Sequence, residues 1–338
     1  MTTRIDEAEI DLPFTTPPDL DATMDIQIPA LAWQAHPAGG YMRTLHLDDR
    51  PITLVVRATP AGLRFTASRP DPALPELLRR LFPIQIADLD IGTHPIWAQL
   101  QARYGGVIVM WAPPFEALII TVLSQNRTGE IVRRVFPALN DRCAGLTPER
   151  LAALDLDLLR ATIRSAGPYK TERLSDLAAL VAADGLDRFD QRILHGPPTE
   201  ALAYLQTLPG VAHKTAACVL VFSARTSHTI PVDVHLFRVA DRLGLASHNG
   251  KLTPSVRDEV IVELLTHGGG VALAHFVFLL VGRTTCTAAT PTCTECFLNA
   301  HCRHATANRR GLAEQPQQSD GSRERHHIDA HATERTQP

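Results

Sequence analysis

The stretch that decides the fold is LPGVAHKTAACVLVF, residues 208–222. A proline–glycine turn opens it, and the apolar run that follows from His213 to Phe222 predicts a helix. A second helix is predicted to begin near Thr199, on the other side of the turn. A helix start leaves backbone N–H groups without intrahelical partners, and such groups can bind a phosphate oxygen without charged side chains. The turn alone is equally compatible with an ordinary connector between two helices.

Lys214 lies in the first turn of this predicted helix. Its neighbours Ala216, Ala217 and Cys218 are all apolar. Burial near the positive end of a helix disfavours the charged form of a lysine, so we expect a neutral, nucleophilic amine. The alternative is a surface lysine whose stem covers apolar neighbours.

Asp233 follows nineteen residues after Lys214, within the segment IPVDVHL. It precedes a helix predicted over residues 234–243, so it can serve simply as the N-cap of that helix. A carboxylate brought close to the amine would instead stabilise positive charge that develops during a reaction.

Four of the six cysteines lie within seventeen residues, at the spacing C-x6-C-x2-C-x5-C. They are Cys286, Cys293, Cys296 and Cys302. One short loop can present four thiolates to a single inorganic centre, either an iron–sulfur cluster or zinc, and the spacing does not separate the two. The other two cysteines stand alone, which indicates a ligand cluster in a reducing compartment rather than a disulfide framework.

The order and spacing of these features resemble the endonuclease III family of helix-hairpin-helix (HhH-GPD) DNA glycosylases. Residues 208–212 are similar to the family's hairpin, with Ala212 in place of the usual second glycine. Residues 279–286 are similar to the helix end that leads into the family's cluster. Lys214 and Asp233 match the family's catalytic lysine and the aspartate of its V-D-x-H segment.

The resemblance covers roughly residues 96–302. It implies a mainly α, two-lobed HhH-GPD fold, with a [4Fe–4S] cluster held by the four clustered cysteines. The family loop between the first two of these cysteines carries basic residues, whereas here it reads TAATPT. We therefore expect this loop to have a structural role and not to contact phosphate.

The implied activity is that of a base-excision-repair DNA glycosylase with abasic-site lyase activity. Asp233 would stabilise the sugar as the base leaves, and Lys214 would form a Schiff base from which β-elimination cuts the strand. Oxidised pyrimidine is the first choice of substrate, followed by 8-oxoguanine and alkylated purine. An adenine glycosylase is disfavoured, because Ile120 occupies the place of the glutamate found in adenine-specific relatives. Alternatives of other classes are a non-catalytic helix-hairpin-helix DNA-binding protein and a zinc-bearing nucleic-acid adaptor.

Contacts with duplex DNA are predicted at two places besides the catalytic pair. Gly210, Ala212 and His213 belong to the hairpin. The segment LSQNRT, residues 123–128, resembles the part of the superfamily that inserts an amide side chain into DNA, and either Gln125 or Asn126 fits that role. Cys218 falls where 8-oxoguanine glycosylases have a cysteine in the base pocket, although a small core residue is the simpler interpretation.

The chain divides into four predicted parts. Residues 1–20 are expected to be mobile, and residues 21–95 to form a small antiparallel β domain around MRTLHL, ITLVVR and GLRFTA. Residues 96–306 are expected to form the helical glycosylase domain, including the cysteine loop 286–302, and residues 307–338 a disordered polar tail. The β domain is similar in position to that of 8-oxoguanine and 3-methyladenine DNA glycosylases.

Composition limits the other possibilities. The chain is 45% hydrophobic and 20% charged, with a formal net charge of −3, so any DNA contact must come from a few local groups. The longest strongly apolar stretch, residues 271–282, is too short to cross a bilayer. We expect a monomeric cytoplasmic protein, associated with the nucleoid through duplex DNA that contains a damaged base or an abasic site.

Overall fold

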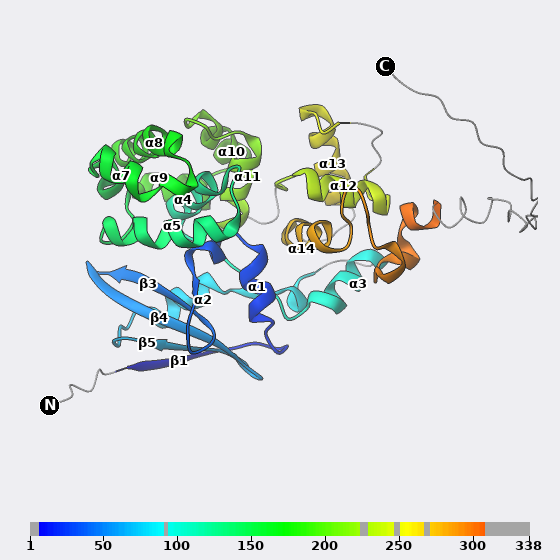
Figure 1. Cartoon of the computed structure of the whole chain (residues 1–338), viewed down its shortest axis with the longest axis horizontal. Coiled ribbons are helices and arrows are strands. Elements are labelled where there is room, and N and C mark those ends of the chain that lie inside the picture. The colour runs from blue at the N-terminus through cyan, green and yellow to red at the C-terminus, as the bar shows by residue number, and fades with distance from the viewer. Residues whose placement is uncertain (1–6, 91–93, 224–228, 247–250, 267–270, 308–338) are drawn as a thin grey trace, which may run out of the picture.

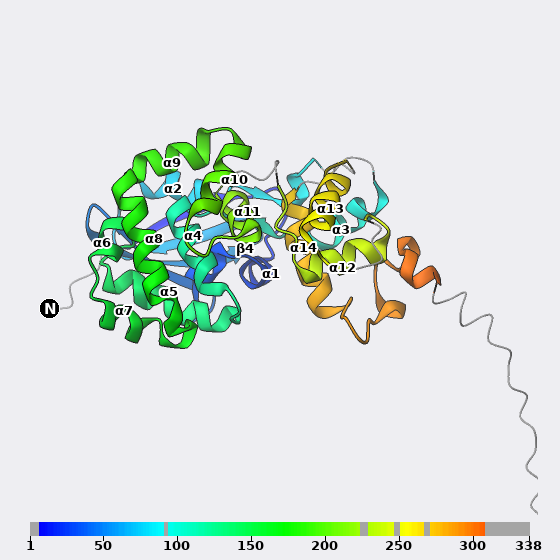
Figure 2. The ribbon, with the colours of Figure 1, turned by 90° about the horizontal axis from the view of Figure 1, so that it is seen from above.

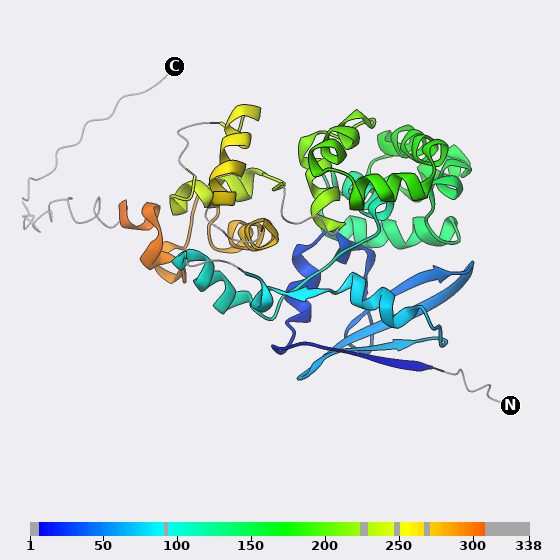
Figure 3. The same cartoon turned by 180° about the vertical axis from the view of Figure 1, so that it is seen from behind.

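The chain folds into a five-stranded sheet and two groups of helices, as Figure 1 shows for the computed structural model. The structure describes residues 7–90, 94–223, 229–246, 251–266 and 271–307. The predicted disordered tail therefore lies outside the described residues, apart from its first residue. One group of helices, the first lobe, covers the sheet, and the second lobe lies beside it, as the views in Figure 2 and Figure 3 agree.

The N-terminal sheet is antiparallel, with strand order β1-β5-β4-β3-β2. Its strands are β1 (Ala8–Pro13), β2 (Gln34–Ala35), β3 (Tyr41–Leu47), β4 (Arg50–Thr59) and β5 (Gly62–Ala67). The predicted three-stranded meander is confirmed as β3, β4 and β5. Along β4, Ile52, Leu54 and Val56 are fully buried, alternating with more exposed residues as a sheet with one covered face requires.

The prediction of a mobile lead-in over residues 1–20 is wrong for β1. Its residues pair with β5 from Ala8 opposite Ala67 to Pro13 opposite Gly62. Residues 8–13 alternate between covered and exposed side chains, a period of two that the acidic composition of the segment obscured. Pairing with β5 supplies the order that composition alone did not predict.

Two helices complete the N-terminal part, α1 (Leu20–Ile26) and α2 (Leu74–Leu81). Trp33 and Phe65 both pack on Phe82, with ring centroids 5.6 and 5.4 Å from its ring. This aromatic cluster joins the sheet to the end of α2. The sheet therefore shares one hydrophobic core with the helices that cover it.

The first lobe is built around α4 (Pro114–Ser124), whose residues are buried almost throughout. The helices that follow are α5 (Gly129–Arg142), α6 (Pro148–Ala152), α7 (Leu156–Thr162), α8 (Thr171–Asp184), α9 (Leu186–His195), α10 (Pro198–Thr207) and α11 (His213–Phe222). The Thr147 side chain caps α6, and α8 ends at Gly185. A helix as apolar as α4 is stable only at the centre of such a bundle.

The second lobe combines helices from distant parts of the sequence. It contains α3 (Pro95–Tyr104), α12 (Val234–Leu243), α13 (Pro254–Thr266) and α14 (Val271–Thr284). Trp97 of α3 stacks on Phe278 of α14, with ring centroids 5.5 Å apart. The short strands β6 (Ile84–Gln85) and β7 (Ile108–Val109) pair as the chain enters and leaves α3. The chain passes from α3 in the second lobe to the first lobe, and it returns to the second lobe between α11 and α12. Residues of α11 and α12 therefore meet at the junction of the lobes.

None of the described helices is both long enough and apolar enough to span a bilayer.

Candidate active site

Lys214 and Asp233 meet at the junction of the two lobes. Lys214 lies in the first turn of α11, and Asp233 is the residue immediately before α12. The Lys214 Nζ atom lies 3.9 Å from the Asp233 Oδ2 atom. The fold therefore brings together the two groups that the sequence predicted as a pair.

The burial predicted around Lys214 is not found. Its side chain is 53% exposed, whereas that of Asp233 is 13% exposed. Ala216, Ala217 and Cys218 are buried, but they pack into the core instead of surrounding the amine. The amine is therefore held beside a carboxylate at an open position and not within an apolar pocket.

Asp233 uses its two carboxylate oxygens differently. Its Oδ1 atom accepts hydrogen bonds from the backbone N–H groups of His235 and Leu236, both at 2.9 Å. This is the N-cap role that the sequence suggested as the simpler alternative. Because capping occupies Oδ1, the other oxygen is left to face the amine of Lys214. One carboxylate therefore caps α12 and also lies beside the Lys214 amine.

The hairpin presents exposed backbone at the start of α11. Gly210 and Ala212 are exposed and His213 is partly buried. Ala212 occupies the N-cap position, and no side chain caps the helix there. The first-turn N–H groups consequently lack the usual side-chain acceptor, which leaves them suited to a phosphate oxygen. Burial lowers the pKa of His213, and the positive charge of Arg257 lowers it further.

Gln125 and Asn126 have different surroundings. Gln125 is tied to the hairpin: its Nε2 donates to the Gly210 carbonyl and to Thr215 Oγ1, both at 3.1 Å, and its Oε1 accepts from Arg173. Asn126 is exposed and has a positive φ of 57°. Among the described residues, no hydrogen bond engages its side chain.

Sequence reasoning missed three residues near this site. Tyr169 is 55% exposed, and the Arg127 guanidinium lies 5.8 Å from its ring centroid. Lys170 is fully buried beneath the loop that carries Gln125. The adjacent Tyr169 and Lys170 could have suggested a nucleic-acid contact. The sequence does not show, however, that they lie beside the loop that carries Gln125, some forty positions earlier.

His275 is the third missed residue, and together with Cys218 it lies beneath Lys214 and Asp233. His275 is 2% exposed, and burial lowers its pKa to about 4. Cys218 is 3% exposed, and burial raises the pKa of its thiol to about 11. The imidazole of His275 and the thiol of Cys218 are therefore neutral near pH 7. The charges of Lys214 and Asp233 contribute to the pKa of each. A single histidine within the apolar run 271–282 was the signal that identifies this position.

The four clustered cysteines line one small cavity beside α12 and α14. Arg238 and Arg242 of α12 hold the loop in place. Arg238 donates to the carbonyls of Gly282 and Cys286 at 2.8 and 3.0 Å. Arg242 donates to the carbonyls of Thr287 and Ala288 at 2.6 and 2.9 Å, and to Cys286 Sγ at 3.4 Å. An N–H group directed at a ligating sulfur is a usual feature around iron–sulfur clusters.

The donor set fits an iron–sulfur cluster. Across the part of the chain that the structure describes, no three Cys, His, Asp or Glu side chains are gathered closely enough for one metal ion. A single zinc ion would draw the thiolates together, with Zn–S distances of about 2.3 Å. Four thiols that line one cavity are compatible with a polynuclear centre.

Comparison with known proteins decides the family. Residues 119–260 match the family model described as HhH-GPD superfamily base excision DNA repair protein. Endonuclease III of Treponema pallidum (strain Nichols) is 35% identical over 218 residues, which cover 62% of this chain and 94% of that protein. The chain belongs to the endonuclease III family. It is a base-excision-repair DNA glycosylase of the endonuclease III type.

Solved structures share the fold of this endonuclease III family member beyond its helical part. A structure of MBOgg1 in complex with a low-affinity DNA ligand aligns with a TM-score of 0.65 and 17% identity, covering 82% of this chain and 95% of that one. The 8-oxoguanine glycosylase/lyase of Clostridium acetobutylicum, in its apo form, aligns with a TM-score of 0.57 and 14% identity, covering 77% and 90%. Alignments of this length extend past the helical lobes, so the architecture with an N-terminal sheet is shared with these glycosylases.

Proposed function

We propose that this glycosylase is bifunctional: it excises an oxidised pyrimidine from duplex DNA and then cuts the strand at the resulting abasic site. The 3.9 Å approach of Lys214 Nζ to Asp233 Oδ2 is the observation that carries the proposal. An amine is a suitable nucleophile for a covalent sugar intermediate, and a carboxylate stabilises a sugar that becomes positively charged. The helix cap fixes Asp233, so this charge is held in place before the reaction begins.

In this proposal Lys214 is the nucleophile and Asp233 stabilises the sugar. The bond between the sugar C1′ atom and the base nitrogen breaks, and its electron pair leaves with the base. Asp233 Oδ2 opposes the positive charge that develops on the sugar. The ammonium of Lys214 loses a proton to solvent, and the lone pair of its Nζ atom then forms a new bond to C1′. Ring opening and loss of the amine proton give a Schiff base between Nζ and C1′. Removal of a C2′ proton then expels the 3′ phosphate and cuts the strand.

Asn126 is the better choice for the side chain that fills the gap left by the extruded nucleotide. Three hydrogen bonds engage the amide of Gln125, so its insertion would break contacts with the hairpin and Arg173. Asn126 is exposed beside Arg127 and Tyr169, and the Tyr169 ring offers a face on which a base can stack. We assign insertion to Asn126 and attachment of the loop to Gln125.

Cys286, Cys293, Cys296 and Cys302 would hold a [4Fe–4S] cluster, which when bound crosslinks four points of the C-terminal loop. Arg242 would donate to a ligating sulfur while it holds the loop carbonyls. Protein purified without oxygen should be brown and absorb broadly in visible light, and Cys293→Ser should lose both properties. A colourless wild-type protein containing one zinc ion would contradict the assignment.

The catalytic proposal is tested by trapping the covalent intermediate. Wild-type protein, Lys214→Ala and Lys251→Ala are incubated with borohydride and duplexes that each carry one oxidised pyrimidine, 8-oxoguanine or alkylated purine. Lys251 is an exposed lysine of the second lobe and serves as a matched control. We expect an adduct from wild-type protein and Lys251→Ala, fastest with oxidised pyrimidine, and none from Lys214→Ala.

Other outcomes separate the alternatives. An undiminished adduct from Lys214→Ala would refute the assignment of the nucleophile. Tight binding of every duplex without strand cleavage would indicate a non-catalytic DNA-binding protein. Fastest cleavage at 8-oxoguanine or at alkylated purine would replace oxidised pyrimidine as the substrate.

A further inference from the structure

Lys170 is a fully buried lysine in the first lobe, and the proposed chemistry does not use it. It ends the short 3-10 turn Pro168–Lys170 that leads into α8, and none of its side chain is exposed. Its Nζ atom donates to the carbonyl oxygens of Leu123 and Gln125, at 2.7 and 2.8 Å. Both carbonyls belong to the end of α4, forty-five or more positions earlier in the chain.

These two carbonyls are the groups that a helix end leaves without partners. The last carbonyls of an α-helix have no intrahelical donor, and the helix dipole favours a positive charge beside them. The chain reverses direction directly afterwards, where Asn126 has a φ of 57° and Arg127 N–H donates to the Ser124 carbonyl at 3.1 Å. The ammonium of Lys170 therefore stabilises the loop at the point where its backbone turns.

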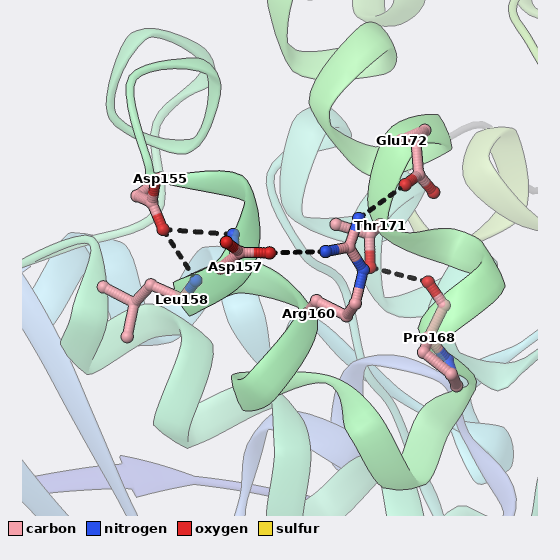
Figure 4. Close-up of polar contacts among 7 residues, drawn as sticks. All are labelled: Asp155, Asp157, Leu158, Arg160, Pro168, Thr171 and Glu172. Atoms are coloured by element: carbon pink, nitrogen blue, oxygen red, sulfur yellow. Dashed lines mark hydrogen bonds and ion pairs between the residues drawn. The ribbon is translucent and has the colours of Figure 1, made fainter.

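The turn that carries Lys170 is itself held on both sides. Figure 4 shows Thr171 Oγ1 donating to the Pro168 carbonyl, at 2.6 Å, and Glu172 paired with Arg160 of α7, at 2.8 Å. Exposed pairs such as the second contribute little stability, but together with the first contact they fix the backbone around Lys170. The amine is thus attached to a rigid support.

Burial of a cation here is unfavourable in itself. Burial, together with the positive charges of Arg127 and Arg173, lowers the pKa of Lys170 to about 8. No carboxylate contributes to that shift. The carbonyls of Leu123 and Gln125 compensate for the charge, together with the Tyr169 ring, whose centroid lies 5.8 Å from Nζ. An apolar side chain of similar length would fill the same space without this penalty, which indicates that the hydrogen bonds themselves are needed.

We propose that Lys170 is a positioning residue that holds residues 124–128 in the conformation that presents Asn126 to duplex DNA. This inference rests on the proposed function and adds a residue that governs DNA distortion without touching DNA. The proposal predicts that a substitution of Lys170 lowers activity only on substrates in which a nucleotide has to leave a duplex.

The first test compares two substrates. Lys170→Met removes both donors, and Lys251→Met makes the same change at an exposed lysine. On a duplex with a damaged base, we expect excision by Lys170→Met to fall on the order of 10- to 100-fold, because small misplacements in an active site have effects of this size. Borohydride trapping on a single-stranded oligonucleotide with a preformed abasic site should stay within about threefold, since no gap has to be filled. Lys251→Met should match wild-type protein on both substrates.

The second test asks whether Lys170 acts through Asn126. Asn126→Ala, Lys170→Met and the double variant form a double-mutant cycle on the damaged duplex. Residues that act as a unit give non-additive losses, so Lys170→Met should add about twofold or less in the Asn126→Ala background. A purely structural role for Lys170 would give equal losses in both backgrounds.

Each outcome supports or overturns the inference. Equal losses on single-stranded and duplex substrates, or an additive cycle, would overturn it. Lys170→Gln keeps amide N–H donors on a shorter side chain. It replaces Lys170→Met in both tests if Lys170→Met does not fold. A failure of the proposed function has another signature, because wild-type protein would then form no adduct with either substrate.

Discussion

Asp233 caps α12, and in the proposed mechanism its carboxylate also stabilises the sugar. Asparagine caps a helix about as well as aspartate, so Asp233→Asn should change the free energy of unfolding by only a few tenths of a kcal/mol. It removes the charge that faces Lys214, and we expect base excision to fall about 100- to 1000-fold. Asp233→Ala should lose the same activity and about 1 kcal/mol of stability in addition. Urea denaturation and single-turnover excision measure the two effects separately.

Asp190 of α9 predicts a pH dependence of stability. Burial raises the pKa of Asp190 to about 6, helped by repulsion from Asp187 and opposed by Arg80. Its Oδ1 atom is buried without a hydrogen-bond partner in the described part of the chain. The folded state therefore holds this proton more tightly than the unfolded state, whose pKa is near 3.8. Stability should fall as the pH rises through the window from 3.8 to about 6.

Asp190→Asn should remove this penalty. We expect the variant to be more stable than wild-type protein at pH 7.5, on the order of 1–3 kcal/mol, and equal to it near pH 4. Urea denaturation at a series of pH values measures the difference. Asp176→Asn, at an exposed carboxylate of α8, is the control and should show no such trend. An equal gain at both ends of the pH range would contradict the explanation.

Single residues were predictable from the sequence where a motif named them. Lys214 and Asp233 were found in this way, and the structure brings them together. The choice between Gln125 and Asn126 depends on hydrogen bonds to residues 210, 215 and 173, which local sequence does not contain. Lys170 was missed for the same physical reason, because its partners lie at the end of a helix far away in the sequence.

At the scale of elements, the hairpin depends on one glycine and not on two. Gly210 has a φ of 72°, and a Cβ atom there would lie 2.3–2.6 Å from atoms of the Arg173 side chain. Ala212 has φ −83° and ψ 173°, an extended conformation that any residue adopts. The alanine that departs from the family pattern is therefore no obstacle to the turn.

Substitutions at these two positions should behave differently. Gly210→Ala should lower the free energy of unfolding on the order of 1–2 kcal/mol and weaken binding of duplex DNA, because the backbone is strained and Arg173 is displaced. Ala212→Gly should leave the affinity within about twofold, because the N–H groups that face phosphate are unchanged. Fluorescence anisotropy with a duplex containing an abasic-site analogue measures both. Equal losses of affinity from the two substitutions would contradict this explanation, because only Gly210→Ala strains the backbone of the turn.

Elements with strong patterns were predicted almost to the residue. The helices α11 and α12 begin and end where the apolar runs and caps indicated. β1 was missed because a strand of six residues, with Glu9 and Asp11 among them, is too short and too polar to stand out before its partner strand is known. Helix periodicity is local information, whereas strand pairing is not.

For the whole molecule, one buried ion pair joins the sheet to the helices. Arg43 of β3 and Glu116 of α4 lie 2.5 Å apart, with side chains 6% and 11% exposed. Arg43→Leu should lower the free energy of unfolding by about 3–5 kcal/mol, because it leaves Glu116 buried and unpaired. The double variant with Glu116→Leu should recover most of this loss, since Arg43 Nε and Glu116 Oε1 already lack partners among the described residues. Urea denaturation of the three variants checks the prediction, and an additive loss in the double variant would contradict it.

Helix α12 begins directly after Asp233, and Arg238 in its middle and Arg242 near its end hold the cysteine loop. The ten residues of α12 span about 15 Å, and the helix moves as one rigid element. If the cysteine loop moved on loss of the proposed cluster, α12 would move Asp233 away from Lys214. Loss of the proposed cluster would then lower base excision without any change in the amount of polypeptide.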